Sequence, residues 1–419
     1  MADYPLRGQL PHGLADLFYE QAAAKCHLEE TLQETFRRWG YTRIIMPTFE
    51  YYETLATDSS IYLQEEMYRL FDREGRVLAL RPDMTVATAR VAGTRLYDQP
   101  LPLRFFYVGN VFRYEEPQAG RRREFTQAGI ELVGAGTPEA DAEVLAVAVA
   151  ALRALGIERF QINLGQVAFL KGILEDISLT NGELSRLERV IGRKNDVELA
   201  RTLADMGIDG SVTRAIMAIP HLCGGPEILS DARGLTDNEI ALQALDRLEQ
   251  IYDLLTAEGV DDYVTLDLGE VRSMAYYTGI TFQGYVEGLG FHVCSGGRYD
   301  GLVGQFGRDL PAVGFALGVE RAMLVTQPEV DIAPDILMEG CEHTDCRALA
   351  ARARALGLVV EVDVQGRTGE ALSAYGRTRG ARRIVSCCDG RAYNVDDGRG
   401  EIYTLTRDEI EQEVATWSR

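Results

Sequence analysis

The 419-residue chain has little positive charge for its size. Lys and Arg number 43 against 64 Asp and Glu, so the formal net charge is −21. A strongly acidic chain repels a polyphosphate backbone at long range. This balance counts against a nucleic-acid partner unless a local basic patch binds it. It says nothing against a small anionic ligand such as ATP.

Cysteine is also scarce, and the seven residues are an odd number scattered along the chain. This usage is typical of reduced thiols in a cytosol rather than of a disulfide framework. Cys341, His343 and Cys346 match no standard zinc-ligand spacing, and Cys387 and Cys388 are adjacent, which suits one tetrahedral ion poorly. We therefore expect no metal site.

Long apolar runs are missing as well. No stretch approaches the ~18 residues of a membrane span, and the opening residues lack the charged-then-apolar pattern of a signal peptide. Hydrophobic residues make up 46% and charged residues 26% of the chain. These values are typical of a globular protein of two or three domains, and we expect a cytoplasmic protein with no membrane partner.

What is present begins with an amphipathic segment. Apolar side chains recur every four residues and predict a helix over residues 16–38. Gly40 ends that helix, and a short strand over 43–46 follows and stops at Pro47, which cannot donate to a sheet. Such an element either forms a dimer contact or is ordinary α/β structure.

Residues 101–134 predict two strands joined by a loop that contains Arg121 and Arg123. Alternation along the second strand predicts that Gln127 and Glu131 lie on the same face. Guanidinium groups bind phosphate in a bidentate manner and stack on rings, so the loop suits a nucleotide. A solvated arginine turn fits the same pattern. Upstream, Asp83 and Thr85 stand between a strand and a helix, where they either cap the helix or face a ligand.

Residues 165–259 show no strand pattern and predict a helical insertion. Beyond it, the adjacent Tyr276 and Tyr277 are expected to point to opposite faces of an extended chain, one packing and one lining a pocket. Arg321 lies in the first turn of a predicted helix, where the helix dipole disfavours a cation, so we expect it to have an anionic partner.

From residue 328 the pattern changes to alternating strands and helices, in the order βαβαβ. This alternation predicts a small α/β domain. Acidic side chains outnumber basic ones there and lysine is absent, which is an unusual composition for a domain that grips nucleic acid.

Several motifs together resemble a known family. The segment around Gly40 and Pro47, the hairpin FRYE…RREFTQ ending at Gln127, and GFALGVER (314–321) resemble motifs one, two and three of class II aminoacyl-tRNA synthetases. LRPDMT (80–85) and SGGRYDGL (295–302) are similar to blocks of histidyl-tRNA synthetase.

The resemblance implies an α+β fold. A class II synthetase-like antiparallel sheet core would occupy residues 1–327, with a helical insertion at about 165–260. A C-terminal α/β domain similar to an anticodon-binding domain would occupy residues 328–419.

The departures from the synthetase pattern narrow the resemblance. RSMAYY (272–277) stands where the synthetase has RGLDYY, Asp83 replaces a glutamate, and Thr126 replaces a histidine. REFTQAGIEL, LCGGPEIL and YYTGITF are similar to the synthetase paralogues that serve as regulatory subunits of ATP phosphoribosyltransferase.

That resemblance implies a non-catalytic subunit without cofactor. It would activate the short catalytic subunit and mediate histidine feedback inhibition in the first step of histidine biosynthesis. It would associate as a homodimer and would not bind tRNA. The alternative is an active histidyl-tRNA synthetase.

The resemblance also implies the roles of individual residues, with no catalytic residue among them. Two groups follow: histidine-binding residues, which are Asp83, Thr85, Arg113, Gln127, Glu131, Arg272, Tyr276 and Tyr277, and nucleotide- or anion-binding residues, which are Arg121, Arg123 and Arg321.

Overall fold

The computed structural model describes residues 8–57, 64–114, 122–271, 276–326, 328–388, 391–398 and 401–417. Contacts divide the chain into two compact units, Met1–Glu329 and Val330–Arg419. The predicted fold class is confirmed: the first unit is built on a largely antiparallel sheet with helices, and the second is a small α/β unit. Within the described ranges, no helix has the length and apolar character needed to cross a bilayer.

The first unit contains a nine-stranded sheet in the order β1-β5-β6-β12-β11-β10-β7-β9-β8. All pairings are antiparallel except β1 with β5 and β7 with β9. In that spatial order the strands are β1 Thr42–Arg43, β5 Leu103–Phe112, β6 Glu124–Val133, β12 Ala312–Gly318, β11 His292–Arg298, β10 Ile280–Val286, β7 Phe160–Gln166, β9 Val264–Asp267 and β8 Cys223–Gly224.

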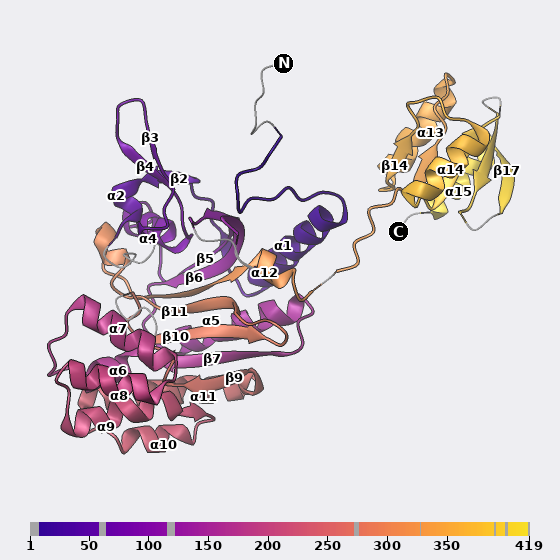
Figure 1. Ribbon diagram of the computed structural model, residues 1–419. Coiled ribbons are helices and arrows are strands. Elements are labelled where there is room, and N and C mark those ends of the chain that lie inside the picture. Colours follow the sequence, from indigo (N-terminus) through magenta and orange to yellow (C-terminus); the bar gives the residue numbers. More distant parts are fainter. Residues whose placement is uncertain are drawn as a thin grey trace. The chain divides into compact units, whose positions relative to one another are not determined.

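Helices α1 (Glu20–Arg38) and α5 (Pro138–Ala154) cover one face of this sheet (Figure 1). The predicted apolar stripe of α1 is confirmed, and the Phe36 ring packs against Phe106 and Phe315 of the sheet. The helix begins at Glu20 rather than at residue 16, because Tyr19 has a φ of 51°, which a right-handed helix does not accommodate. The sheet face beneath these helices is apolar.

A smaller sheet, in the order β2-β4-β3, lies beside the large one. The strand expected over residues 43–46 is reduced to β1. Ile44 still donates its N–H to the carbonyl of Phe106, and the chain then leaves for β2. The elements of this region are β2 Phe49–Tyr51, α2 Tyr52–Leu55, β3 Arg69–Phe71, β4 Val77–Leu80 and α4 Thr85–Thr94.

The helices of the predicted insertion gather beside β7 and β9 (Figure 1). The insertion is not wholly helical, as β8 pairs antiparallel with β9. A two-residue strand leaves no alternation in the sequence, so the pattern could not reveal it. The elements are α6 Val167–Ile173, α7 Asn181–Gly192, α8 Asp196–Asp205, α9 Gly210–Ala218, η2 Ile219–His221, α10 Ile228–Arg233, α11 Glu239–Ala257 and η3 Asp261–Tyr263; η4 Val303–Phe306 and α12 Val319–Ala322 come later in the chain.

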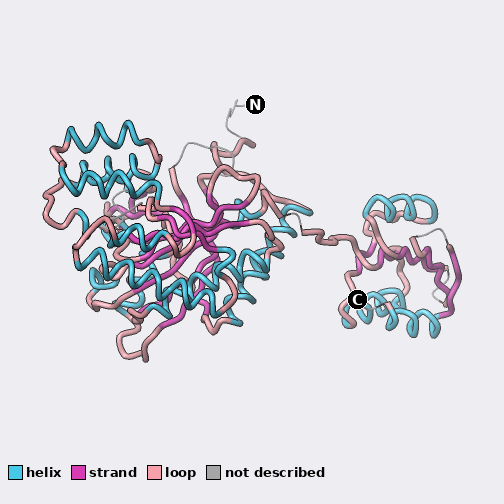
Figure 2. Tube along the Cα trace, turned by 90° about the horizontal axis from the view of Figure 1, so that it is seen from below, coloured by secondary structure: helices cyan, strands magenta, loops and turns pink. Residues whose placement is uncertain are grey.

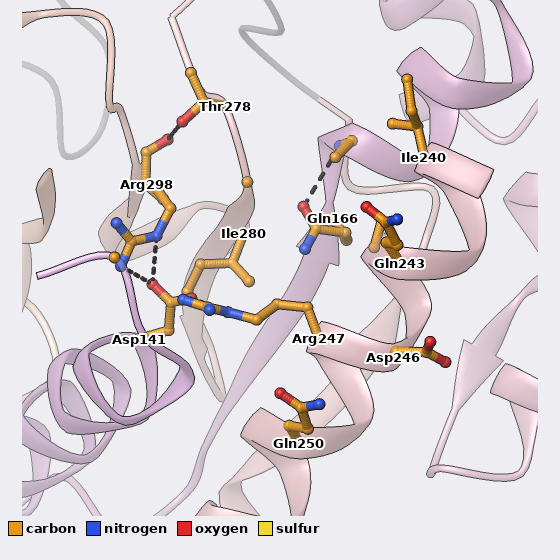
Figure 3. Close-up of a pocket in the computed structure, with 14 residues that line it drawn as sticks. Asp141, Gln166, Ile240, Gln243, Asp246, Arg247, Gln250, Thr278, Ile280 and Arg298 are labelled. Carbon is orange, nitrogen blue, oxygen red and sulfur yellow. Dashed lines mark hydrogen bonds and ion pairs between the residues drawn. The ribbon is translucent and has the colours of Figure 1, made fainter. Parts of the chain in front are cut away.

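One ion-pair network ties the insertion to the sheet and to α5. Asp141 of α5 is 1% exposed and accepts hydrogen bonds from Arg247 of α11 and from Arg298 of β11 (Figure 3). Arg298 also binds the Asp300 carboxylate at 2.9 Å. Two guanidinium groups thus share one buried carboxylate, and removing that carboxylate would leave the buried Arg298 guanidinium with the more exposed Asp300.

The second unit has a five-stranded sheet in the order β14-β13-β15-β16-β17, with helices on both sides (Figure 2). Its first five elements were predicted, and the hairpin β16–β17 and helix α15 were not. The elements are β13 Ile336–Met338, α13 Thr344–Ala355, β14 Val360–Val362, α14 Gly369–Arg379, β15 Arg383–Cys387, β16 Ala392–Asp396, β17 Ile402–Thr406 and α15 Arg407–Thr416.

We predict that Asp141→Asn lowers the free energy of unfolding of the first unit by roughly 3–5 kcal/mol, because it removes the buried carboxylate that two guanidinium groups share. The matched control is Glu287→Gln, which breaks the exposed Arg159–Glu287 pair and is expected to cost about 0–1 kcal/mol. Urea unfolding followed by circular dichroism measures both. Equal unfolding midpoints for the two variants would contradict a structural role for the network.

Candidate functional site

The face of the large sheet opposite α1 and α5 is polar. Strand β6 pairs with β5 on one side, where Gln127, Gly129 and Glu131 lie opposite Gly109, Tyr107 and Phe105 respectively. It pairs with β12 on the other side, where the same three residues lie opposite Gly318, Ala316 and Gly314. Directly opposed residues of paired strands share a face. Gln127, Glu131 and Tyr107 therefore project from the same side of the sheet, as the alternation along β6 predicted for the first two.

Glu131 is the centre of this face. Its carboxylate is 1% exposed, and the Tyr107 hydroxyl donates to Oε1 at 3.1 Å. The Tyr299 hydroxyl donates a short hydrogen bond to Oε2, and the Thr85 hydroxyl contacts the same carboxylate. Three hydroxyl groups from three separate segments thus satisfy one buried acid.

The sheet residues beneath the Glu131 carboxylate are glycines. A Cβ on Gly314 would lie 1.9 Å from Oε2 of Glu131, so no other residue fits there without displacing the acid. Gly314 is paired in register with Gly297 of β11, and a Cβ on Gly297 would lie 2.7 Å from the Tyr277 ring. Two neighbouring glycines therefore let a carboxylate and an aromatic ring lie flat against the sheet.

The N-terminus of α4 borders the same site. Asp83 Oδ1 accepts a hydrogen bond from the Val86 N–H at 3.3 Å, and Gln127 Oε1 accepts one from the Met84 N–H at 3.2 Å. Asp83 therefore caps the helix, as one of the two sequence interpretations held. Asp83 also lies close enough to Glu131 for the two carboxyls to repel. It therefore both caps the helix and borders the site.

The two adjacent tyrosines do not lie in an extended strand, and the expectation that they point to opposite faces is wrong. Their ring centroids are 4.8 Å apart in an edge-to-face arrangement. Strand β10 begins only at Ile280, so the chain is turned where the pair stands. Tyr276 stacks on Tyr299 with centroids 5.5 Å apart. This packing brings both tyrosines to the Glu131 side of the sheet.

We call this group the Glu131 site. Its members come from β5, β6, the start of α4 and the segments beside β10 and β11, and they are Asp83, Thr85, Tyr107, Gln127, Glu131, Tyr276, Tyr277 and Tyr299. The sequence analysis missed Tyr107 and Tyr299. Tyr107 lies in the strand that pairs with the Glu131 strand, and Tyr299 lies in the SGGRYDGL block, so both positions offered a signal.

Burial sets the protonation of the Glu131 site. Loss of hydration raises the pKa of Glu131 to about 7, against the lowering effect of the Tyr299, Thr85 and Tyr107 hydroxyls. Burial likewise raises the pKa of Asp83, and the guanidinium of Arg113 lowers it in part. Near neutral pH the Glu131 carboxyl therefore exists in both forms. A cationic ligand favours the ionised form, so the site suits an ammonium or an imidazole group.

The arginines that were predicted to bind histidine or an anion make different contacts. Arg113 donates from Nε to the carbonyl of Pro82 at 2.9 Å and lies over the Phe125 ring. Arg123 lies over the Tyr114 ring, 4.2 Å from its centroid. Arg321 donates to the carbonyl of His292 at 2.9 Å and lies over the Phe291 ring. Arg121 and Arg272 lie outside the described residues.

A separate cavity of about 540 Å³ lies on the other side of the sheet, between α11 and β10 (Figure 3). The Asp141–Arg247 pair forms part of its wall, with Gln166 and Gln243 around it. Arg298 also lines this cavity, while Tyr299, the next residue, belongs to the Glu131 site. Two consecutive residues at the end of β11 thus lie on opposite sides of the sheet.

Comparisons with known proteins match most of the chain. The histidyl-tRNA synthetase family model matches residues 13–322. An ATP phosphoribosyltransferase regulatory subunit of Moorella thermoacetica is 43% identical over 89% of this chain and 96% of its own length. One of Acetivibrio thermocellus is 36% identical over 96% of this chain and 97% of its own length.

Solved structures give the same result. A Bacillus halodurans protein described as an ATP phosphoribosyltransferase regulatory subunit/histidyl-tRNA synthetase superposes with a TM-score of 0.81 at 32% identity, over 91% of this chain and 98% of that chain. A Nostoc histidyl-tRNA synthetase superposes with a TM-score of 0.79 at 22% identity, over 98% of this chain and 99% of that chain, which establishes a shared fold.

The raised pKa of Glu131 predicts a pH-dependent stability. The folded carboxyl holds its proton up to about pH 7, whereas 4.5 is the ordinary value. This contribution to stability is complete below pH 4.5 and is lost as the pH rises through 7. Its size is on the order of 3 kcal/mol.

Glu131→Gln, which keeps a neutral group at all pH values, should reduce the fall in unfolding free energy between pH 5 and pH 8. Urea unfolding at both pH values measures the fall. Glu124→Gln, on the same strand but the opposite face, should keep the full wild-type fall. An equal fall in Glu131→Gln and the wild type would show that the Glu131 carboxyl is already ionised at pH 5.

Proposed function

Because the chain belongs to the family of ATP phosphoribosyltransferase regulatory subunits, which share the histidyl-tRNA synthetase fold, we propose that the Glu131 site binds histidine as the effector of the enzyme complex. The role of the chain is regulatory rather than catalytic, and its partner is the catalytic subunit of ATP phosphoribosyltransferase. The partner in this proposal is the short form of that subunit. The complex carries out the first step of histidine biosynthesis.

The observation that carries this proposal is the buried Glu131 carboxyl with its tyrosine partners. Histidine carries an ammonium group and an imidazole, and both interact favourably with a carboxylate. Asp83, Thr85 and Gln127 add further polar groups at the border of the site, and the rings of Tyr276 and Tyr277 offer a flat surface for an imidazole. The two sheet glycines let the Glu131 carboxylate and the Tyr277 ring lie against the floor of the site.

The histidine carboxylate needs a cation at the same site. Arg113 lies close enough to Asp83 to lower the pKa of that carboxyl, so its guanidinium borders the place where the histidine carboxylate would lie. Arg272 is assigned to the same task through the family resemblance. In this arrangement the positive groups of histidine face the two acids and its negative group faces the arginines.

Feedback inhibition then follows from linkage. Histidine inhibits only if it binds the inhibited assembly more tightly than the active one, and couplings of this kind are typically ~1–3 kcal/mol. Tyr299 connects the Glu131 site to Arg298, and through it to Asp141 and the insertion helix α11. This connection offers a route by which an occupied site alters a distant surface. Reciprocally, the catalytic subunit must change the affinity of the chain for histidine.

We further propose that the chain associates as a homodimer through the β1–β2 region. Ile45 is 82% exposed, and Phe49 and Tyr51 of β2 are also exposed. β1 is an edge strand of the large sheet, and an edge with exposed apolar side chains favours association. A second copy is the occupant we favour, because this segment resembles motif one of the class II synthetases.

Reconstitution with a short catalytic subunit tests the histidine proposal. The mixture should form a stable complex with raised phosphoribosyltransferase activity that histidine inhibits. Glu131→Gln should raise the histidine concentration for half inhibition by roughly 10-fold or more, since a hydrogen bond to a charged group contributes ~1.5–3 kcal/mol. The complex itself should persist.

The control in that experiment is Glu124→Gln, which should inhibit like the wild type. Unchanged inhibition in Glu131→Gln would contradict the site assignment. The synthetase alternative predicts that the chain alone catalyses histidine-dependent ATP–pyrophosphate exchange and forms no complex. Arg113, Arg123 and Arg321 favour this alternative, because they match arginines of the synthetase motifs.

Sedimentation velocity tests the dimer. The wild-type chain should sediment as a dimer and Ile45→Asp as a monomer, because a charge in a buried apolar contact is costly. Val197→Asp is the matched control, since Val197 is also 82% exposed but lies in the insertion. A dimer that survives both Ile45→Asp and Phe49→Asp would place the interface elsewhere.

A further inference from the structure

The second unit brings three cysteines together from three separate segments. Cys341 follows strand β13, Cys346 lies in the first turn of helix α13, and Cys387 ends strand β15. Their three sulfur atoms all lie within 4.8 Å of one another. β13 and β15 are parallel neighbours, so their carboxyl ends meet at one edge of the sheet, where ligands of α/β folds bind.

This spacing is close to that of a metal-thiolate site. With Zn–S bonds of about 2.3 Å, the sulfur atoms around a tetrahedral zinc ion are ~3.8 Å apart. The three sulfurs therefore need to move inward by no more than about 1 Å. None of the seven cysteines forms a disulfide among the described residues, so the three thiols are reduced. The Cys346 sulfur makes a 3.9 Å contact with the Tyr393 hydroxyl, which a metal ion would have to displace.

Packing alone explains only part of the arrangement. Cys346 is 3% exposed and belongs to the apolar core of the unit, where a free cysteine behaves as a small hydrophobe. Cys341 and Cys387 are only half-buried and pack at the border of that core. All three sulfurs nevertheless converge on one another, although two of the thiols come from partly exposed positions.

A cavity beside the thiols provides access. It has a volume of about 510 Å³ and is lined by Cys341 and Cys346 together with acidic residues that include Glu339 and Glu342. Glu339 Oε2 accepts a hydrogen bond from the Cys387 N–H at 3.0 Å, which fixes a carboxylate next to the third thiol. The cavity thus reaches two of the three thiols and leaves space for a fourth ligand.

We propose that Cys341, Cys346 and Cys387 form a binding site for one thiophilic metal ion of the zinc class, with a fourth position facing the cavity. Three sulfur ligands select zinc and similar ions over magnesium or calcium, which bind oxygen. Binding would tie β13, α13 and β15 together and stabilise the second unit. The inference is independent of the histidine proposal, since it concerns other residues in another unit.

Cobalt titration of the full chain tests the site. The reduced protein, freed of metal by a chelator, is titrated with Co²⁺ and followed by absorption. One equivalent should produce the thiolate-to-cobalt charge-transfer band and the intense visible bands of tetrahedral cobalt, and Zn²⁺ should abolish both. Zinc binding should also raise the unfolding temperature of the second unit.

Three variants make the test specific. Cys346→Ser and Cys341→Ser should each weaken cobalt binding by at least 10-fold, and Cys341→Ser serves if the buried substitution impairs folding. Cys388→Ser is the matched control, because this exposed neighbour of Cys387 is outside the cluster, and it should bind as the wild type does. A wild-type chain without the charge-transfer band, or equal binding in all variants, would overturn the proposal.

Discussion

The buried carboxyl of Glu131 holds several segments of the first unit together. An acid in the middle of a sheet is tolerated only if its oxygens find donors, and here the donors come from β5, from the start of α4 and from the end of β11. Gly314 must remain glycine because a Cβ there would collide with the acid. One charged group thereby fixes four segments relative to one another.

The two faces of the large sheet have different roles. The face beneath α1 and α5 is apolar and holds the core, and the opposite face carries the Glu131 site. The Arg298–Tyr299 pair joins the two, since Arg298 binds Asp141 on the core side while the hydroxyl of Tyr299 binds Glu131. This arrangement suits a regulatory subunit, in which an occupied pocket must influence a surface far from it.

Sequence patterns predicted the parts of the molecule whose periodicity is long. The stripe of α1, the shared face of Gln127 and Glu131, and the alternating start of the second unit all follow from spacing alone. Short or irregular features left no such signal. Tyr107 was hidden in an apolar run, the two-residue strand β8 shows no alternation, and the turn at Tyr276 looked like extended chain. Cys387 joins Cys341 and Cys346 only through the parallel pairing of β13 and β15, so local spacing could not reveal the cluster.

In the proposed function, histidine binds at Glu131 and requires the ionised form of its carboxyl. Calorimetric titration of histidine into the isolated chain, repeated in buffers of different ionisation enthalpy at pH 7, measures affinity and proton release together. The account predicts saturable binding with release of protons in the wild type and in Glu124→Gln, and weaker binding in Glu131→Gln with less release. Binding of equal affinity in Glu131→Gln, or no binding by the wild-type chain, would contradict it.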